Sequence, residues 1–419
     1  MGAQAGQGLA GARAKPDRRQ SWLTFGLIVA TIWLAGQIVT QGMADHYAPQ
    51  RPAAAVLWRG DSADALASLA EQRLIARDPA HAAFFARKAL QQWPLDIVAI
   101  STLGVALDQD GQARRADQVM TLAGRLGWRD GLTQVWLFGH RALQGRYDEA
   151  MQRADALLRR EVQFQSQVFA ALAALTHDPR AIAPLARRLQ LQPSWRYDFV
   201  WGLGQSMTPQ TEADVHALLA ALAKGPTPPT NLELSPYLQK FIAAQDWPKA
   251  IAAWRELSRA APPAGEFVYD GGFDQAQGVP PFDWGISQSA GATTLVADDP
   301  SEGQGKALRV EYDGFSSSQF LKQLLVIPPG DYVLSGKTRQ ETQAAPRSLG
   351  WEVQCAGDGH VLAKAPGAMA KPGQWSTFRI PFSVPGAACP SQWLQLSADP
   401  GDRRTDIVVW YDDLQVRRR

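Results

Sequence analysis

Apolar residues along the chain follow two different periods. Between residues 61 and 262 they recur at the three- and four-residue spacing of amphipathic helices. Further along they alternate with polar residues, and in "ALRVEYDG" the side chains of Leu308, Val310 and Tyr312 share one face. The pattern therefore predicts a helical region followed by a β-rich region.

The helical pattern repeats with a step of 34 residues. The positions that keep this step are Leu69, Leu103 and Leu137 (103 − 69 = 34; 137 − 103 = 34) and Ala82, Ala116 and Ala150. Gly111 and Gly145 fall inside successive units, where a small residue can end one helix and let the chain fold back. We therefore predict an all-α solenoid of about six helical hairpins.

This spacing resembles the tetratricopeptide repeat. Leu103 and Gly104 match the Leu-Gly pair of that family, and Pro94 fits its terminal proline. "GRYDEA" is close to its turn and second-helix start, whereas its early Trp is missing throughout and residues 194–225 are only loosely similar. The resemblance implies a curved scaffold whose groove binds a protein partner.

The β-rich region contains about eight to ten short alternating segments. Two further examples are "SLGWEVQC" and "FRIPFSV", and turns such as "PPGD", "KPGQ" and "DPGD" separate the segments. Short strands divided by tight turns are typical of a two-sheet sandwich.

The order of its motifs resembles the jelly-roll carbohydrate-binding modules. An opening "YDGGFD" is followed by Trp284, by "GKALRVEYDG" and by a closing "VVWYDDLQV", although Asp270 and Asp274 replace the usual Asn and Glu. In that family the first and last strands often share a structural calcium ion, so the resemblance implies that Asp274 and Asp412 hold one. The alternative is that these carboxylates face solvent and that the glycines only form a turn or bulge.

The resemblance also implies a polysaccharide ligand, which needs flat aromatic rings beside polar groups. The candidate residues are Trp375, Trp393, Gln395 and Trp284. Trp393 is the strongest of them because it has the opposite parity to Leu394 and Leu396. For each ring the alternative is packing in the core.

The N-terminal forty residues combine a basic segment with a long apolar run. Residues 1–20 carry four basic side chains against Asp17, and residues 22–39 contain no charge. Such a run can cross a bilayer as a helix, and the preceding basic residues favour a cytoplasmic N-terminus. We predict a single-pass anchor in a bacterial inner membrane with the bulk of the chain in the periplasm. A signal peptide cleaved near "GMADHYA" is the alternative.

The two cysteines, Cys355 and Cys389, lie close to the C-terminus. Outside the cytoplasm an even, sparse count favours one disulfide, whereas two buried free thiols are the alternative. The predicted divisions are a cytoplasmic basic tail (1–20), a transmembrane signal anchor (21–41), a linker (42–60), the solenoid (61–262) and the sandwich (264–419).

The charge balance and the motifs of the sequence argue against several classes of function. The chain has 42 basic and 40 acidic residues, which argues against a nucleic-acid partner. The sequence contains no nucleophile elbow, phosphate loop or zinc motif, and we expect no catalysis, although paired glycosidase carboxylates converge only in a fold. We predict a non-catalytic scaffold of envelope or exopolysaccharide synthesis or export, in which the sandwich contacts glycan. The alternative is an assembly factor that binds only proteins.

Overall fold

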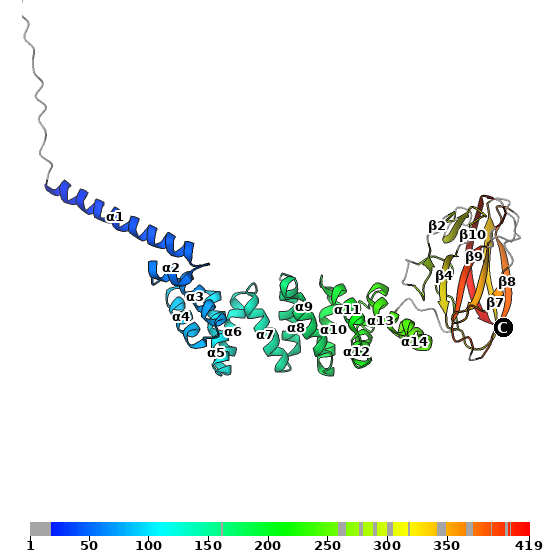
Figure 1. Cartoon of the computed structure of the whole chain (residues 1–419), viewed down its shortest axis with the longest axis horizontal. Coiled ribbons are helices and arrows are strands. Elements are labelled where there is room, and N and C mark those ends of the chain that lie inside the picture. The colour runs from blue at the N-terminus through cyan, green and yellow to red at the C-terminus, as the bar shows by residue number, and fades with distance from the viewer. Residues whose placement is uncertain are drawn as a thin grey trace, which may run out of the picture. The chain divides into compact units, whose positions relative to one another are not determined.

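The computed structural model describes residues 18–419 apart from residues 161, 259–264, 276–279, 288–290, 300–304, 317–318, 342–348, 366–371, 387, 399–400 and 403. The predicted basic tail up to residue 17 and the predicted junction at residues 262–264 lie outside this part. Within the described residues a series of helices precedes a series of strands (Figure 1). The predicted order of helical and β-rich regions is therefore confirmed.

The helices are α1 (Arg18–Tyr47), α2 (Pro52–Trp58), α3 (Ala63–Ile75), α4 (Pro79–Gln92), α5 (Ile97–Gln109), α6 (Ala113–Leu126), α7 (Gly131–Leu143), α8 (Tyr147–Leu158), α9 (Gln165–Leu175), α10 (Pro179–Gln190), α11 (Arg196–Ser206), α12 (Glu212–Ala223), α13 (Asn231–Ala243) and α14 (Trp247–Leu257), with a 3-10 turn at Val162–Phe164. They belong to two compact units, Met1–Glu161 and Val162–Arg419.

In the first unit, successive hairpins begin at a constant interval. Helices α3, α5 and α7 start at Ala63, Ile97 and Gly131 (97 − 63 = 34; 131 − 97 = 34). Aspartate side chains cap α5 and α7 by accepting the N–H of the third helical residue. Gly111 and Gly145 follow α5 and α7 with φ of 77° and 71°, the left-handed conformation that ends a helix. The alanines of the repeat, Ala82, Ala116 and Ala150, are fully buried where the helices cross.

Among the described helices, α1 is long and apolar enough to cross a membrane, over the segment Phe25–Tyr47. Its last turn does not lead into an extended linker. Ala48, directly after α1, packs with Ala55 of α2 and Ala65 of α3, and Tyr47 lies against the same cluster. Residues 42–60, expected to be a linker, therefore contain the end of α1 and all of α2, and they pack onto the first hairpin.

The second unit begins with helices that pair in a less regular way, α11 against α13 and α10 against α12. Thr230 and Glu233 form a capping box at the start of α13. Near the end of this helical segment, Trp254 of α14 stacks on Phe282 at 5.3 Å between ring centroids and meets Tyr269 edge-on at 5.4 Å. Aromatic packing thus continues from α14 into the segment that opens the β-rich region.

The strands are β1 (Gly285–Ile286), β2 (Ala292–Asp298), β3 (Lys306–Tyr312), β4 (Gln319–Leu325), β5 (Gly330–Gln340), β6 (Leu349–Cys355), β7 (Val361–Lys364), β8 (Ser376–Val384), β9 (Gln392–Ala398) and β10 (Ile407–Arg418). One antiparallel sheet has the order β1-β4-β9-β6-β7 and the other β2-β3-β10-β5-β8. These two sheets form the predicted jelly-roll sandwich.

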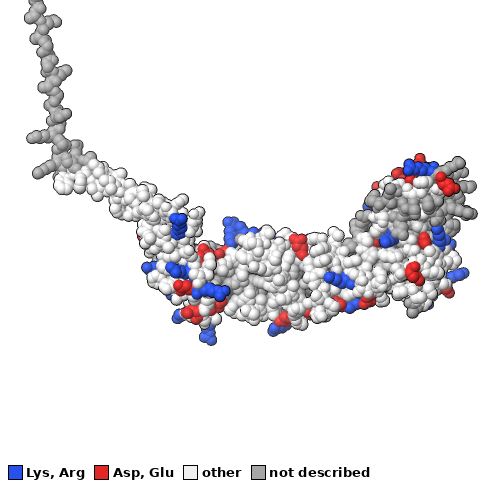
Figure 2. Space-filling model, in the orientation of Figure 1, with Lys and Arg blue, Asp and Glu red and all other residues white. Residues whose placement is uncertain are grey.

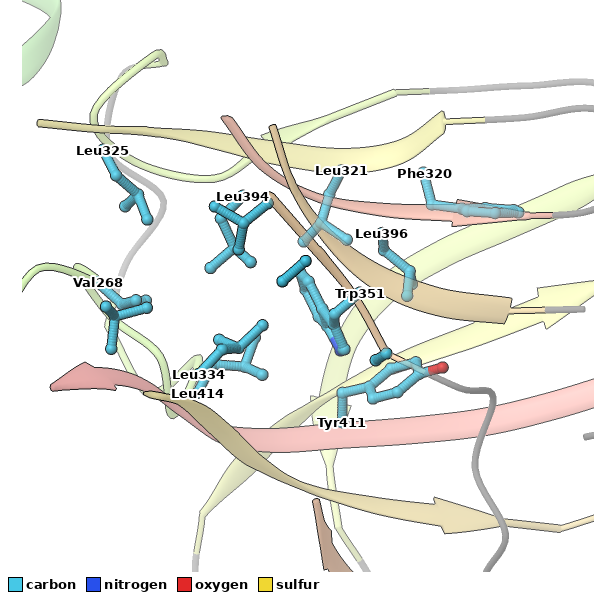
Figure 3. Packing of buried hydrophobic residues seen from close by; sticks show 14 of the residues in the cluster. Val268, Phe320, Leu321, Leu325, Leu334, Trp351, Leu394, Leu396, Tyr411 and Leu414 are labelled. Atoms are coloured by element: carbon cyan, nitrogen blue, oxygen red, sulfur yellow. The ribbon is translucent and has the colours of Figure 1, made fainter. Parts of the chain in front are cut away.

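The space between the sheets is filled by the apolar residues of each alternating strand. Trp351 lies at the centre of this core, with Leu394, Leu396 and Tyr411 around it (Figure 3). Leu308, Val310 and Tyr312 face inward as their alternation predicts. Cys355 and Cys389 are buried beside this core and form the predicted disulfide, which ties the end of β6 to the loop before β9.

Candidate functional site

Polar and aromatic side chains gather on the outward face of the sheet β1-β4-β9-β6-β7. In β9, Leu394 and Leu396 point into the core, so Trp393 and Gln395 point outward. The strand register adds the neighbours of these two residues, because directly opposed residues share a face. We call the set the β9 face; its polar and aromatic members are Lys322, Glu352, Gln354, Trp393, Gln395 and Ser397, and its apolar member Leu324, directly opposite Trp393, is buried.

The side chains of the β9 face contact one another in pairs. Lys322 Nζ lies over the Trp393 ring, 4.6 Å from its centroid. Gln354 Nε2 donates to Gln395 Oε1 at 3.2 Å. Ser397 Oγ donates to Glu352 Oε2 at 3.0 Å. The face therefore combines one partly exposed indole with amide, carboxylate, hydroxyl and ammonium groups on a rigid sheet.

These groups suit a ligand that has apolar ring faces and hydroxyl groups. Trp393 and Gln354 are partly exposed and can reach such a ligand. Gln395 is only 4% exposed, so it serves mainly to orient the Gln354 amide. Sequence reasoning missed Lys322, Glu352 and Gln354, because only the register of the strands places them beside Trp393 and Gln395. It also missed Ser397, which alternation along β9 places on the same face.

The structure does not bring the other two predicted rings to this face. Trp284 is 6% exposed and packs in the core against Phe273 and Trp351, while its Nε1 donates to the carbonyl of Asp270. It cannot present a flat face to a ligand. Trp375 precedes β8 of the other sheet, and its Nε1 donates to Asp299 at 2.7 Å. Of the four predicted residues, only Trp393 and Gln395 lie together.

The two carboxylates predicted to hold calcium do lie close together. Asp412 precedes a bulge in β10, and Asp274 ends the opening segment. A Cβ on Gly272 would lie 3.3 Å from Asp274 Oδ2 and 3.7 Å from Asp412 Oδ1, so both side chains approach the same glycine. Burial, together with the Asp413 and Asp274 carboxylates, raises the pKa of Asp412 to about 6.

The carboxylate oxygens of Asp274 and Asp412 are the type of ligand that calcium prefers. Asp274 Oδ1 accepts the Lys306 N–H at 2.9 Å and Asp412 Oδ1 accepts the Asp413 N–H at 2.7 Å, which leaves the second oxygen of each carboxylate for another ligand. A bound cation would offset the repulsion between the two groups, and backbone carbonyls would complete its oxygen shell. Among the described residues, no group of three or more His, Cys, Asp or Glu is placed to hold a metal ion.

Replacing Asp412 with asparagine should change how stability depends on pH. Because the folded pKa of about 6 exceeds the unfolded value, the folded state binds more protons between these two values. The free energy of unfolding of the parent protein should therefore fall as pH rises from about 4 to about 6, and D412N should lack this slope. Above pH 6, D412N should be more stable by about 1 kcal/mol, allowing for solvent screening of a partly exposed group. Denaturant unfolding in EDTA at several pH values measures this difference.

Asp413 provides the matched control for this pH experiment. It is the neighbouring carboxylate but forms an exposed ion pair with Lys337 at 2.9 Å, and asparagine tolerates its φ of 52°. D413N removes one of the carboxylates that raise the pKa of Asp412 but leaves its burial unchanged, so it should retain the part of the slope that burial causes. If calcium binds as predicted, it should stabilise the parent protein and D413N but not D412N, and an unchanged parent stability would contradict this prediction.

The first unit contains a groove of about 630 Å³ between the end of α1 and the first hairpins. Its lining includes Asp45, Asp64, Glu71, Asp96, Ile75 and Val98. Ile75 and Val98 are 83% and 39% exposed, and no Lys or Arg occurs among the described lining residues. Burial, and then the carboxylates of Asp130 and Asp96, raise the pKa of Glu71. Elsewhere the visible face of the molecule mixes basic and acidic residues without a large area of one sign (Figure 2).

No known family model matches the chain, and no curated protein matches it. Among solved structures, the CBM22-1 xylan-binding domain from Paenibacillus barcinonensis is 16% identical, with 38% of this chain and 97% of that chain covered and a TM-score of 0.28. A CBM4 structure is 16% identical over 36% of this chain and 99% of that one, with a TM-score of 0.27. TmCBM61 in complex with beta-1,4-galactotriose is 18% identical over 37% of this chain and 99% of that one, with a TM-score of 0.26.

Proposed function

We propose that the protein is a non-catalytic, membrane-anchored binding protein of the bacterial periplasm, whose sandwich contacts a polysaccharide on the β9 face. The single observation that carries the glycan assignment is the juxtaposition of Trp393 with the hydrogen-bonded amides of Gln354 and Gln395. The helical array, which we assign to the tetratricopeptide type, would bind a protein partner. Such a protein would serve as a scaffold in envelope or exopolysaccharide synthesis or export.

The β9 face lies on a rigid part of the sheet, which favours glycan binding. Trp393 lies on the central strand of its sheet, and the neighbouring strands β4 and β6 fix the side chains on either side of it. A ring on a rigid strand loses little conformational entropy when a sugar stacks on it. The partly exposed Gln354 amide, oriented by Gln395, supplies a donor and an acceptor for sugar hydroxyl groups beside the ring.

Trp393→Ala should weaken glycan binding about tenfold or more, because the apolar face of a sugar would lose the ring it packs on and a loss of about 1.4 kcal/mol is tenfold in affinity. The measurement is binding of the full-length protein in detergent to an array of bacterial and plant polysaccharides, with calcium supplied. Phe315→Ala is the matched control: Phe315 is also an aromatic ring beneath a basic side chain, Arg404, but lies in the loop after β3.

Two results would count against this assignment. If no polysaccharide binds, the sandwich is a spacer or a protein-binding head, and the protein is an assembly factor whose contacts lie on surfaces such as the groove of the first unit. If a polysaccharide binds equally to the parent protein and to W393A, the ligand lies elsewhere on the sandwich.

The retained anchor is the second part of the proposal, and the packing of α1 supports it. Ala44 and Ala48 are 0% and 3% exposed, and Ala48 contributes to the cluster with Ala55 and Ala65. Cleavage near residue 48 would remove this packing from the first hairpin and expose apolar surface. Intact-mass measurement of the protein extracted from membranes should therefore give the uncut chain. A mature N-terminus near residue 48 would contradict the anchor.

A further inference from the structure

We infer that the ligand of the β9 face is an acidic polysaccharide, one whose sugars carry carboxylate groups, and that Lys322 selects it. This inference rests on the proposed glycan binding and specifies the class of glycan. The Lys322 ammonium group lies over the Trp393 ring.

The ammonium group makes the Trp393 ring a poor platform for a neutral sugar. A neutral sugar stacks its C–H groups on an open ring face, but here Lys322 Nζ lies 4.6 Å from the ring centroid. Stacking would have to displace this cation–π contact. A sugar that carries a carboxylate can instead form an ion pair with the Lys322 ammonium group without displacing it from the ring, and the sugar can then lie beside the ring.

Lys322 is also electrostatically available for an anion. Among the described residues, no carboxylate lies within ion-pair distance of Lys322 Nζ. The lysine is partly exposed, and its position is fixed by the ring beneath it and by β4. An ammonium group held in place in this way loses less side-chain entropy on binding an anion than a freely rotating lysine does.

The register extends the argument to one row of residues that crosses all five strands. The row runs through Gly285, Lys322, Gln395, Glu352 and Lys364. With strands about 4.8 Å apart, the two lysines stand about 14 Å from one another along the row. At Gly285, at one end of the row, Pro280 occupies the space beside the strand, with its Cβ and Cγ 3.4 Å from where a Cβ would lie.

Charge along this row alternates between ammonium and carboxylate groups. Glu352, between the lysines, accepts the Ser397 hydroxyl and would face a sugar hydroxyl rather than a sugar carboxylate. The row therefore matches an extended glycan that presents carboxylates at intervals and hydroxyl groups between them. A fully neutral glycan would leave the Lys322 ammonium group without a counter-charge when it covers the face.

The experiment compares acidic polysaccharides with their carboxyl-reduced forms, in which each carboxylate has become a primary alcohol. The probes are polygalacturonate, alginate, hyaluronate and xanthan, and the full-length protein in detergent is titrated with each pair. We expect at least one acidic probe to bind and to lose about tenfold or more in affinity when reduced. Lys322→Gln should lose the same factor on the acidic form only, and Lys322→Arg should retain most of the binding.

Lys88→Gln is the matched control, because Lys88 also lies over an aromatic ring, that of Phe84 at 4.8 Å, but on α4. K88Q should bind both forms as the parent protein does. Equal affinity for the acidic and reduced forms, or unchanged binding by K322Q, would overturn the acidic specificity while leaving glycan binding intact. Failure of every probe, together with failure of neutral polysaccharides, would overturn the proposed function itself.

Discussion

Gly271→Ala should destabilise the sandwich by at least about 3 kcal/mol. A Cβ at this position would lie 1.9 Å from the carbonyl oxygen of Leu414 and 2.8 Å from its carbonyl carbon, and backbone atoms cannot move aside as a side chain can. The Gly271 carbonyl also accepts the Leu414 N–H at 2.8 Å, so the added methyl group would separate the opening segment from β10. Leu414 is itself part of the core, and its displacement would loosen the packing around it.

The buried disulfide provides a probe that reports on the sandwich alone. Cys355 and Cys389 are each 2% exposed, so a thiol reductant reaches them mainly when the sandwich opens. G271A should therefore be reduced much faster than the parent protein. Gly386→Ala is the control, because no atom lies within 4 Å of its Cβ position and its stability should change by no more than about 0.5 kcal/mol. Equal reduction rates for G271A and G386A would show that the opening segment does not hold the sandwich together.

Alternation predicted the sandwich well because each buried strand has one apolar face. In β6 the pattern runs through Leu349, Trp351, Val353 and Cys355, and all four side chains are buried. Alternation also predicted that Trp393 lies on the outward face of the sheet, because the residues before and after it along β9 face the core. Alternation within a strand is a local property, so the sequence alone is enough to predict it.

The partners of Trp393 could not be predicted in the same way. Lys322 and Gln354 lie about 71 and 39 residues away in the chain, and they meet the ring only through the strand order β4-β9-β6. Strand order and register depend on the packing of the whole domain. A sequence pattern within one strand contains no information about either.

The direction of the Trp284 side chain could not be predicted from alternation. It stands next to β1, which has only two residues, so no alternation exists from which to infer its direction. The ring instead fills the core beside Trp351, with a ring-centroid distance of 5.6 Å. Helix α2 was missed for a related reason: "PAAAVLW" is almost wholly apolar and has no polar face that would indicate a helical period.

Glu233→Gln should destabilise the helices of the second unit by about 3 kcal/mol, the lower end of the range for breaking a buried ion pair. Glu233 and Arg196 are 4% and 6% exposed, and Arg196 Nε and Nη2 donate to the two Glu233 oxygens at 2.8 and 3.0 Å. Glutamine preserves size and can still accept hydrogen bonds, but it removes the counter-charge. The guanidinium group would then remain buried among neutral acceptors, which are the carbonyls of Leu189, Thr227 and Pro228 and the Thr227 hydroxyl.

The matched control is Lys249→Gln, which breaks an ion pair of the same unit on the surface. Lys249 and Glu212 join α14 to α12 at 2.5 Å, with 47% and 27% of their side chains exposed, so its loss should cost no more than about 1 kcal/mol. Thermal unfolding followed by far-ultraviolet circular dichroism compares the two variants. Because the cost of E233Q comes from an uncompensated charge, high salt should restore little of it, since ions do not reach the buried pair. If E233Q and K249Q unfold at the same temperature, water must reach Arg196 in the folded protein, and the pair joins α11 to α13 no more strongly than a surface contact does.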